Sequence, residues 1–136
     1  MKKLILTVGL PRSGKSTWAR EQGFPIVNPD SVRLAIHGEA FIQKAEPIVW
    51  QHVFIMAEAL FNAGHETIII DATNTMKRRR DEWKNKFPDA EIQFQVFETP
   101  AEECIRRAVR TGQLYLIPVI ERMEKQWDLT GVESEV

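Results

Sequence analysis

The chain has 136 residues, of which 43% are hydrophobic and 27% are charged, a composition typical of one globular domain. Its 18 basic and 19 acidic residues give a net charge of −1, which excludes attraction of nucleic acid by the field of the whole protein. Cys104 is the only cysteine, which excludes an internal disulfide and a multi-cysteine metal site and favours a reducing, cytoplasmic location. No apolar run approaches the ~20 residues of a membrane span, so no membrane partner is expected.

Short apolar runs alternate with longer helical patterns along the chain. This alternation predicts an α/β fold, with a parallel sheet of four strands and helices on both of its faces. Functional loops are then expected at the carboxyl ends of the strands. Residues 133–136 show no apolar pattern that would place them in the core. Strands are predicted over 4–8, 25–28, 66–70 and 92–97, and helices over 16–22, 29–36, 47–63, 77–86, 101–110 and 119–127.

A glycine-rich segment follows the first predicted strand. Residues 9–16 read Gly-Leu-Pro-Arg-Ser-Gly-Lys-Ser and match the P-loop pattern G-x-x-x-x-G-K-S/T at every fixed position. Such a loop surrounds phosphates with backbone N–H groups, while Lys15 reaches the β- and γ-phosphates and the Ser16 hydroxyl ligates Mg²⁺. ATP as co-substrate and Mg²⁺ as cofactor are therefore expected. Arg12 is either a further phosphate contact or a solvated loop charge. The predicted nucleotide-binding residues are Gly9, Pro11, Arg12, Ser13, Gly14, Lys15, Ser16 and Thr17.

Two acidic residues follow predicted strands. Asp30 comes after the second strand, and Arg33 lies one helical turn further on, so both can face one cleft. There Asp30 can accept a proton from an attacking hydroxyl and Arg33 can hold an acceptor phosphate; the alternative is a helix cap at Asp30 with a local ion pair. Asp71 follows the third strand, where a P-loop fold holds its magnesium-side acid, directly or through water. The alternative is a turn in which Asp71 bonds Thr73 or Asn74.

Arginines are concentrated on two later helices. Arg106 and Arg110 share one face of the predicted helix 101–110, which suits a lid over the ATP phosphates, and the neighbouring Arg107 can substitute. The alternative is a solvated basic face. Residues 77–80 read Lys-Arg-Arg-Arg and are either a contact for a nucleic-acid backbone or an exposed helix that pairs with the acids at 81 and 82. The three histidines have no ligand-like spacing, and Cys104 is expected to be a small core residue.

Several segments together resemble the 5′-kinase domain of phage-type polynucleotide kinases. They are residues 9–20, Asn28-Pro29-Asp30-Ser31-Val32-Arg33, Ile70-Asp71-Ala72-Thr73-Asn74, Arg106-x-x-x-Arg110 and residues 117–123. The resemblance implies a P-loop kinase fold with a C-terminal helical lid over about residues 101–115. It also implies transfer of the ATP γ-phosphate to the 5′-hydroxyl end of DNA or RNA, as in nucleic-acid end repair.

The resemblance also assigns roles to individual residues. It implies that Asp30 is the general base and that Arg33 binds the 3′-phosphate of the acceptor. The residues expected to be catalytic are Lys15, Asp30, Arg33 and Arg110. Those expected to bind the acceptor are Asp30, Arg33, Asp71, Thr73, Asn74 and Arg78. Arg106 and Arg110 are expected to bind the donor from the lid, and Ser16 and Asp71 to lie near the metal.

The sequence departs from this family in two respects. Arg12 stands where the family usually has a small residue, and no D-x-D-x-T pattern of a phosphatase domain occurs. One kinase domain over residues 1–136 without 3′-phosphatase activity is therefore expected, in the host cytoplasm if the protein is phage-encoded. A homo-oligomer is possible. The alternatives are a small-molecule P-loop kinase acting on a nucleoside, sugar acid or antibiotic, and a non-catalytic nucleotide-binding module.

Overall fold

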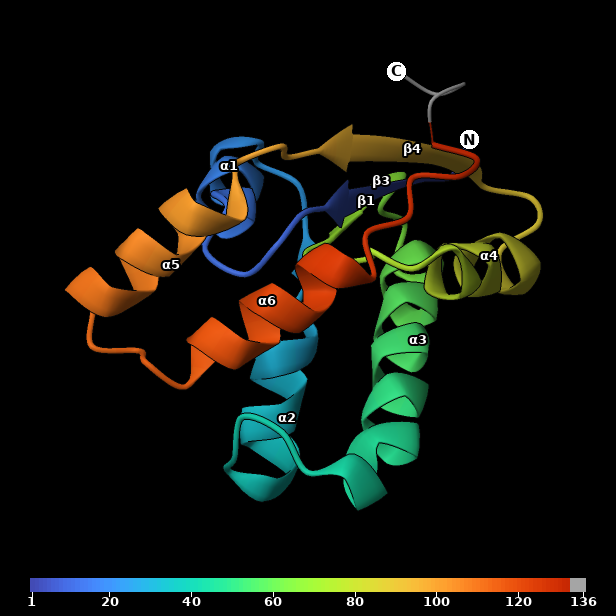
Figure 1. The fold of residues 1–136 in the computed structure, drawn as a ribbon. Coiled ribbons are helices and arrows are strands. Elements are labelled where there is room, and N and C mark those ends of the chain that lie inside the picture. The colour runs from blue at the N-terminus through green and yellow to red at the C-terminus, as the bar shows by residue number, and fades with distance from the viewer. Residues whose placement is uncertain (133–136) are drawn as a thin grey trace.

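The computed structural model describes residues 1–132, so the expectation for residues 133–136 lies outside it. Four strands form one sheet in the order β2-β3-β1-β4, and every neighbouring pair is parallel. Figure 1 shows β1 and β4 running in the same direction. The predicted α/β architecture with a four-stranded parallel sheet is therefore confirmed. The strands are β1 (Lys3–Val8), β2 (Ile26–Val27), β3 (Thr67–Ile70) and β4 (Glu91–Val96).

Each predicted helix is present, with small shifts at its ends. The predicted helix 119–127 spans Leu116–Lys125 instead, because Pro118 is tolerated in the first turn of a helix, where its missing N–H is not needed. Pro47 likewise lies in the first turn of its helix, one residue after the start. The helices are α1 (Lys15–Glu21), α2 (Pro29–His37), α3 (Glu46–Asn62), α4 (Lys77–Lys86), α5 (Ala101–Arg110) and α6 (Leu116–Lys125), with a 3₁₀ turn at Gln43–Ala45.

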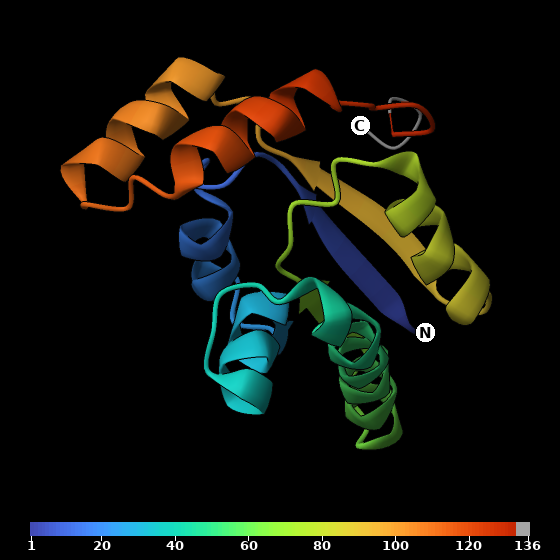
Figure 2. The same cartoon turned by 60° about the horizontal axis from the view of Figure 1, so that its bottom comes forward.

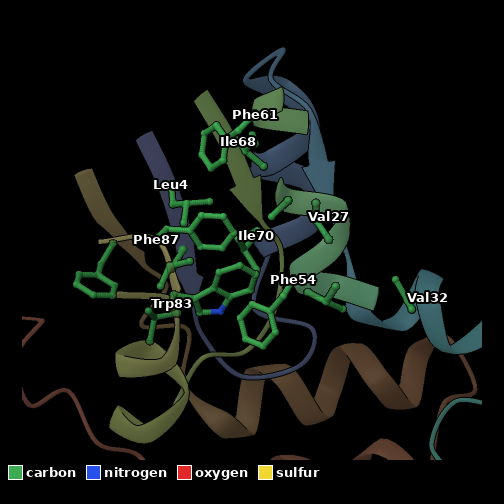
Figure 3. Packing of buried hydrophobic residues seen from close by; sticks show 14 of the residues in the cluster. Leu4, Val27, Val32, Phe54, Phe61, Ile68, Ile70, Trp83 and Phe87 are labelled. Atoms are coloured by element: carbon green, nitrogen blue, oxygen red, sulfur yellow. The ribbon is translucent and has the colours of Figure 1, made fainter. Parts of the chain in front are cut away.

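The sheet is covered on both faces, as its continuous apolar strands predict. Ile68 and Ile70 of β3 point toward Phe54 of α3 and Trp83 of α4, which lie together on one face of the sheet (Figure 3). Ile69 points the other way and is also fully buried. The Phe54 and Trp83 rings are 4.4 Å apart between centroids, so this face is closed by tightly packed aromatic side chains.

A second, smaller apolar cluster joins the phosphate loop to α5 and α6. It contains Leu10 of the loop, Cys104 and Ala108 of α5, and Ile120 of α6. Figure 2 shows α5 and α6 side by side beyond the carboxyl ends of β1 and β4. The burial of Cys104 confirms its predicted core position. The base of the predicted lid is therefore packed onto the loop that it was expected to cover.

Within residues 1–132, the helices are all too short or too polar to cross a bilayer. The exposed surface of this part of the chain carries scattered apolar side chains, such as those of Phe41 and Ile55.

Trp83 is a sensitive test of the core because its indole is fully buried but its Nε1 has no hydrogen-bond partner within residues 1–132. Trp83→Ala should lower the free energy of unfolding by about 3–5 kcal/mol, since it leaves a cavity beside Phe54 and Phe87. Trp83→Phe should cost less than Trp83→Ala, because the remaining ring fills part of the cavity and the unpaired N–H is removed. Urea denaturation measures both losses. Equal losses for the two variants would contradict this account of the site.

Candidate active site

The loop between β1 and α1 is curled so tightly that only glycine fits at position 9. A Cβ atom on Gly9 would lie 2.6 Å from Ser13 Oγ and 3.0 Å from Phe97 Cβ. Gly14 has a φ of 105°, in the region that favours glycine. Arg12 has a φ of 68°, which is uncommon for a residue with a side chain, and that side chain is exposed. The backbone therefore has the curled form that the glycine-rich pattern predicts.

The Lys15 side chain is folded into this loop. Its Nζ donates to the carbonyl oxygen of Leu10 at 2.6 Å and contacts Ser13 Oγ at 3.5 Å. Burial lowers the pKa of Lys15 to about 8, although the nearby carboxylates of Asp71 and Asp30 favour its charged form. Both acidic residues selected from the sequence thus lie within electrostatic reach of the loop lysine.

Asp71 connects the loop to the second strand. Its Oδ2 accepts hydrogen bonds from Ser16 Oγ at 2.6 Å and from Asn28 Nδ2 at 3.1 Å. The carboxylate is buried and directed toward α1 and the end of β2, rather than toward the turn that follows it. Asn28 Oδ1 in turn accepts from the backbone N–H of Asp30 at 2.7 Å and caps α2. The cap predicted at Asp30 as an alternative is therefore wrong, because Asn28 occupies that position, whereas the local ion pair of the same alternative is present between Asp30 and Arg33.

Thr73 and Asn74 hold the loop after β3 against β1. Asn74 Nδ2 donates to the carbonyl oxygen of Thr7 at 2.8 Å, and the N–H of Gly9 donates to the carbonyl oxygen of Thr73 at 2.9 Å. Thr7 Oγ1 donates to the carbonyl oxygen of Ala72 at 2.7 Å. The Asn74 side chain is buried and directed at β1, away from the solvent side where an acceptor would lie. Both residues shape the loop that presents Asp71.

Asp30 and Arg33 are brought together on α2, as their spacing predicts. Arg33 Nη1 donates to Asp30 Oδ1 at 2.7 Å, while Arg33 Nε and Nη2 donate to the two carboxylate oxygens of Glu46 at 2.9 and 2.7 Å. The Asp30 side chain is 76% exposed, whereas those of Arg33 and Glu46 are 15% and 17% exposed. Although burial alone would lower it, the hydrogen bonds and charge of Glu46 raise the pKa of Arg33. Asp30 is thus accessible, and Arg33 is held in place by its hydrogen bonds to Glu46 of α3.

The arginines of α5 differ from the expected lid arrangement. Arg106 and Arg110 are exposed and pair with Glu103 at 2.8 and 3.3 Å. Arg107 also pairs with Glu103, at 3.0 Å, and its Nη1 donates to the carbonyl oxygen of Arg12 at 3.0 Å. Hydrogen bonds from Arg106 and Arg107 hold the pKa of Glu103 below its usual value. In this structure Arg107 contacts the phosphate loop, whereas Arg106 and Arg110 face solvent.

The basic segment at the start of α4 does not present four exposed charges. Arg80 is buried and donates to the carbonyl oxygens of Asn74 and Thr130, and Arg79 lies 3.7 Å from the centre of the Trp50 ring. Lys77 pairs with Asp81, and Arg79 pairs with Glu82. The alternative prediction of pairing within the helix is therefore confirmed for these two residues. Arg78 is exposed.

Sequence reasoning missed four residues that organise the site. Asn28 directly follows β2 and Thr99 lies in the loop after β4, where polar residues are expected to serve a site, so their position was a usable signal. Glu46 and Glu103 offered no such signal: each is one acid among many, and only the packing of α3 against α2 and of α5 upon the loop gives them arginine partners. Within residues 1–132 no cluster of three metal-ligating side chains occurs.

Residues 4–113 match the AAA domain family, which is most of the chain. The chain belongs to that family. Its AAA domain is similar to a chain in the structure of a Pnkp1/Rnl/Hen1 complex, with 34% identity over 78% of this chain and a TM-score of 0.70. A second structure, of the Pnkp1/Rnl/Hen1 RNA repair complex, matches over 93% at 25% identity with a TM-score of 0.69. The AAA domain spans only 38% and 46% of the two matched chains.

The same fold occurs in small-molecule kinases. The Mycobacterium tuberculosis APS kinase matches 79% of this chain and 68% of its own, at 19% identity with a TM-score of 0.61. A gluconokinase from Sinorhizobium meliloti matches 95% of this chain and 77% of its own, at 17% identity with a TM-score of 0.66. These likenesses show the fold alone. The AAA domain therefore has a P-loop kinase-like α/β fold, built on a four-stranded parallel sheet.

The pKa of Lys15 predicts how ATP affinity depends on pH. Since the ammonium is the form that attracts phosphates, and its pKa without ligand is about 8, ATP binding should weaken by up to about tenfold between pH 7 and pH 9. Calorimetry at several pH values measures the Kd, and proton uptake should accompany binding above pH 8. Lys15→Met should bind more weakly at both pH values and lose the dependence. A wild-type Kd that stays constant to pH 9 would contradict this prediction.

The stability of the ligand-free protein should move in the opposite direction. The pKa of Lys15 is lower in the folded chain than the value of 10.5 expected when the chain is unfolded, so the unfolded state binds more protons between pH 8 and 10.5. The contribution of Lys15 to the free energy of unfolding should therefore become more favourable as pH rises through this window. Comparing wild type with Lys15→Met by urea denaturation isolates that contribution.

The Glu46–Arg33 pair should contribute measurably to stability because both side chains are largely buried. Glu46→Gln keeps the shape but removes the charge opposite Arg33, and it should lower the free energy of unfolding by roughly 1–2 kcal/mol. Glu58→Gln is the matched control, since Glu58 is exposed on the same helix. The control should change stability by less than about 0.5 kcal/mol. Equal effects in both variants would show that the pair contributes nothing specific.

Proposed function

We propose that this AAA domain is a magnesium-dependent polynucleotide 5′-hydroxyl kinase, which transfers the γ-phosphate of ATP to the 5′-hydroxyl end of DNA or RNA. The observation that carries the proposal is a continuous hydrogen-bonded path from Ser16 through Asp71, Asn28 and Asp30 to Arg33. It joins the phosphate loop to an accessible carboxylate with an arginine beside it. The similarity to a chain of the Pnkp1/Rnl/Hen1 RNA repair complex supports the same conclusion.

On the donor side, the loop would bind the ATP phosphates. The curled backbone from Gly9 to Gly14 supplies N–H groups, and Lys15, held inside the loop, supplies an ammonium for the β- and γ-phosphates. Of the arginines on α5, Arg107 is the one in contact with the loop, while Arg110 and Arg106 lie further out.

The residues present fit a magnesium ion bound together with ATP. The Ser16 hydroxyl and the Asp71 carboxylate are oxygen donors of the kind that Mg²⁺ prefers, and their oxygens lie together, 2.6 Å apart. Because Mg²⁺ usually takes one or two protein ligands beside substrate phosphates, a larger protein cluster is not needed. The ion would neutralise charge on the β- and γ-phosphates. Asn28 would keep the Asp71 carboxylate oriented, since it donates to the same oxygen.

On the acceptor side, Asp30 would act as the general base. The acceptor hydroxyl oxygen forms a bond to the γ-phosphorus while the bond from that phosphorus to the β–γ bridging oxygen breaks, and the electron pair stays with ADP. The proton of the hydroxyl passes to the Asp30 carboxylate, which is accessible and lies within electrostatic reach of Lys15. Positioning of the hydroxyl in line with the breaking bond provides the remaining acceleration.

Arg33 would hold the phosphate of the acceptor nucleotide. Its three hydrogen bonds to Glu46 and Asp30 leave one N–H on each terminal nitrogen, which is the donor pair that a phosphate can engage in a bidentate manner. Glu46 would keep the guanidinium in place, so that little side-chain entropy is lost on binding. Binding of the acceptor phosphate would not require Asn74, which is buried, or Lys77, which pairs with Asp81 within α4.

One observation favours a small-molecule acceptor instead. The charge of Arg33 is already balanced by Asp30 and Glu46, and two of the basic residues of α4 are paired, so the acceptor side has little uncompensated positive charge. A neutral alcohol would suit such a surface. Salt separates the two proposals: the KM for an oligonucleotide should rise steeply with salt, whereas the KM for a neutral nucleoside should be nearly constant.

Asp30→Asn tests the proposed base. With labelled ATP and a 5′-hydroxyl oligonucleotide, kcat should fall by about 100-fold or more, because a general base contributes that much, while the Kd for ATP stays within about twofold. Asp89→Asn is the matched control, since Asp89 is exposed and paired with Lys2, in the loop before β4 at the far end of the sheet. An Asp30→Asn variant with near-normal turnover would remove Asp30 from this role.

The acceptor class is tested with four compounds at fixed ATP: 5′-hydroxyl DNA, 5′-hydroxyl RNA, a 3′-nucleotide and a plain nucleoside. The proposal requires transfer to at least one of the two oligonucleotides and a preference for the 3′-nucleotide over the nucleoside, because Arg33 would hold the 3′-phosphate. Transfer to the nucleoside alone would support the small-molecule alternative. Binding of ATP without transfer to any alcohol would support a non-catalytic module.

A further inference from the structure

Two successive carbonyl groups of the phosphate loop are held by residues from a distant part of the chain. Thr99 Oγ1 donates to the carbonyl oxygen of Ser13 at 2.9 Å, and Arg107 Nη1 donates to the carbonyl oxygen of Arg12 at 3.0 Å. Thr99 lies between β4 and α5, and Arg107 lies in α5. The glycine-rich pattern does not include these contacts, and the proposed function gives no role to Thr99.

These bonds fix the direction of backbone N–H groups. In a trans peptide the C=O of one residue and the N–H of the next point in opposite directions. Thr99, which holds the Ser13 carbonyl, therefore determines where the Gly14 N–H points, and Arg107, which holds the Arg12 carbonyl, does the same for the Ser13 N–H. The Ser13 N–H donates to the carbonyl oxygen of Leu10 at 3.2 Å, so the Arg107 contact supports this turn of the loop. The Thr99 contact sets the orientation of the Gly14 N–H.

The loop needs such support because its backbone is unusual. Arg12 and Gly14 have φ values of 68° and 105°, on either side of the buried Ser13. Conformations of this kind persist where surrounding contacts hold them. Arg107 is itself held by Glu103 at 3.0 Å, and the helix is packed onto the loop through Leu10. The segment from Thr99 to Arg107 thus acts on the loop as one rigid unit.

We propose that Thr99 and Arg107 are positioning residues for ATP: Thr99 keeps the Gly14 amide oriented for the phosphates before the nucleotide arrives, and Arg107 keeps the preceding turn of the loop curled. The inference rests on the ATP binding of the proposed function and concerns residues outside the glycine-rich pattern. Preorganised donors bind better than donors that must first be ordered, so loss of either contact should weaken phosphate binding without changing the acceptor site.

Thr99→Val tests this proposal because it preserves the shape of the side chain and removes its donor. The Kd for ATP, measured by calorimetry, should rise about fivefold, as expected for loss of one hydrogen bond, and KM for the acceptor should stay unchanged. Thr99→Ser restores the hydroxyl and should bind ATP within about twofold of wild type. Arg107→Met should weaken ATP binding in the same direction.

Thr111→Val is the matched control. The Thr111 hydroxyl also donates to backbone carbonyls, at the other end of α5, so this variant loses similar bonds without touching the loop. Its Kd for ATP should equal that of wild type, even where both valine variants lower the melting temperature of the ligand-free protein. A positioning role further predicts that the ¹H–¹⁵N signal of Gly14 shifts in ligand-free Thr99→Val, whereas it stays in place in Thr111→Val.

The outcomes separate this inference from the proposed function. Equal ATP affinity in wild type and Thr99→Val, or an equal loss in Thr111→Val, overturns the positioning role while leaving the kinase proposal intact. Failure of the wild-type protein to bind ATP overturns the kinase proposal, and this inference with it. A weaker Kd in Thr99→Val that Thr99→Ser restores, together with the Gly14 signal shift, supports it.

Discussion

The site depends on a single buried carboxylate that reaches two loops at once. Asp71 follows β3, and because β3 lies between β1 and β2, the acid can accept hydrogen bonds from Ser16 on one side and from Asn28 on the other. Two donors on one carboxylate oxygen compensate for its burial, which would otherwise be costly. The parallel strand order thus brings the phosphate loop and the start of α2 together, and with them Lys15 and Asp30.

The parts of the site that the sequence predicts are those fixed by local spacing. The loop of residues 9–16, the acid after β3 and the Asp30–Arg33 pair all follow from motif spacing or helical periodicity, and the structure places them as expected. The role of Glu46 could not be predicted, because its hydrogen bonds to Arg33 depend on how the segment between α2 and α3 brings the start of α3 beside α2. Sequence spacing gives neighbours within an element, but the contacts between elements come from packing.

The arginines of α5 show the same limit. Spacing by four residues puts Arg106 and Arg110 on one face, but it does not say which face turns toward the loop. Burial of Cys104 and Ala108 decides this, because Arg107 lies beside that apolar stripe while the other two arginines lie across the helix from it. A basic helix next to a phosphate loop therefore presents its inner arginine to the backbone and its outer ones to solvent.

Compensation of charge within the site explains how a cationic centre fits a protein with a net charge of −1. Arg33 is paired with Asp30 and Glu46, and all three arginines of α5 share Glu103. Binding of phosphates would then exchange one set of anionic partners for another instead of neutralising bare charge. Since a ligand must outcompete carboxylates already in place, such a site favours ligands with several charges at fixed spacing over single anions. On the donor side, the triphosphate of the proposed ATP substrate would meet that condition. The single phosphate proposed to bind beside Arg33 would meet it less well, because Asp30 and Glu46 already balance the charge of that arginine.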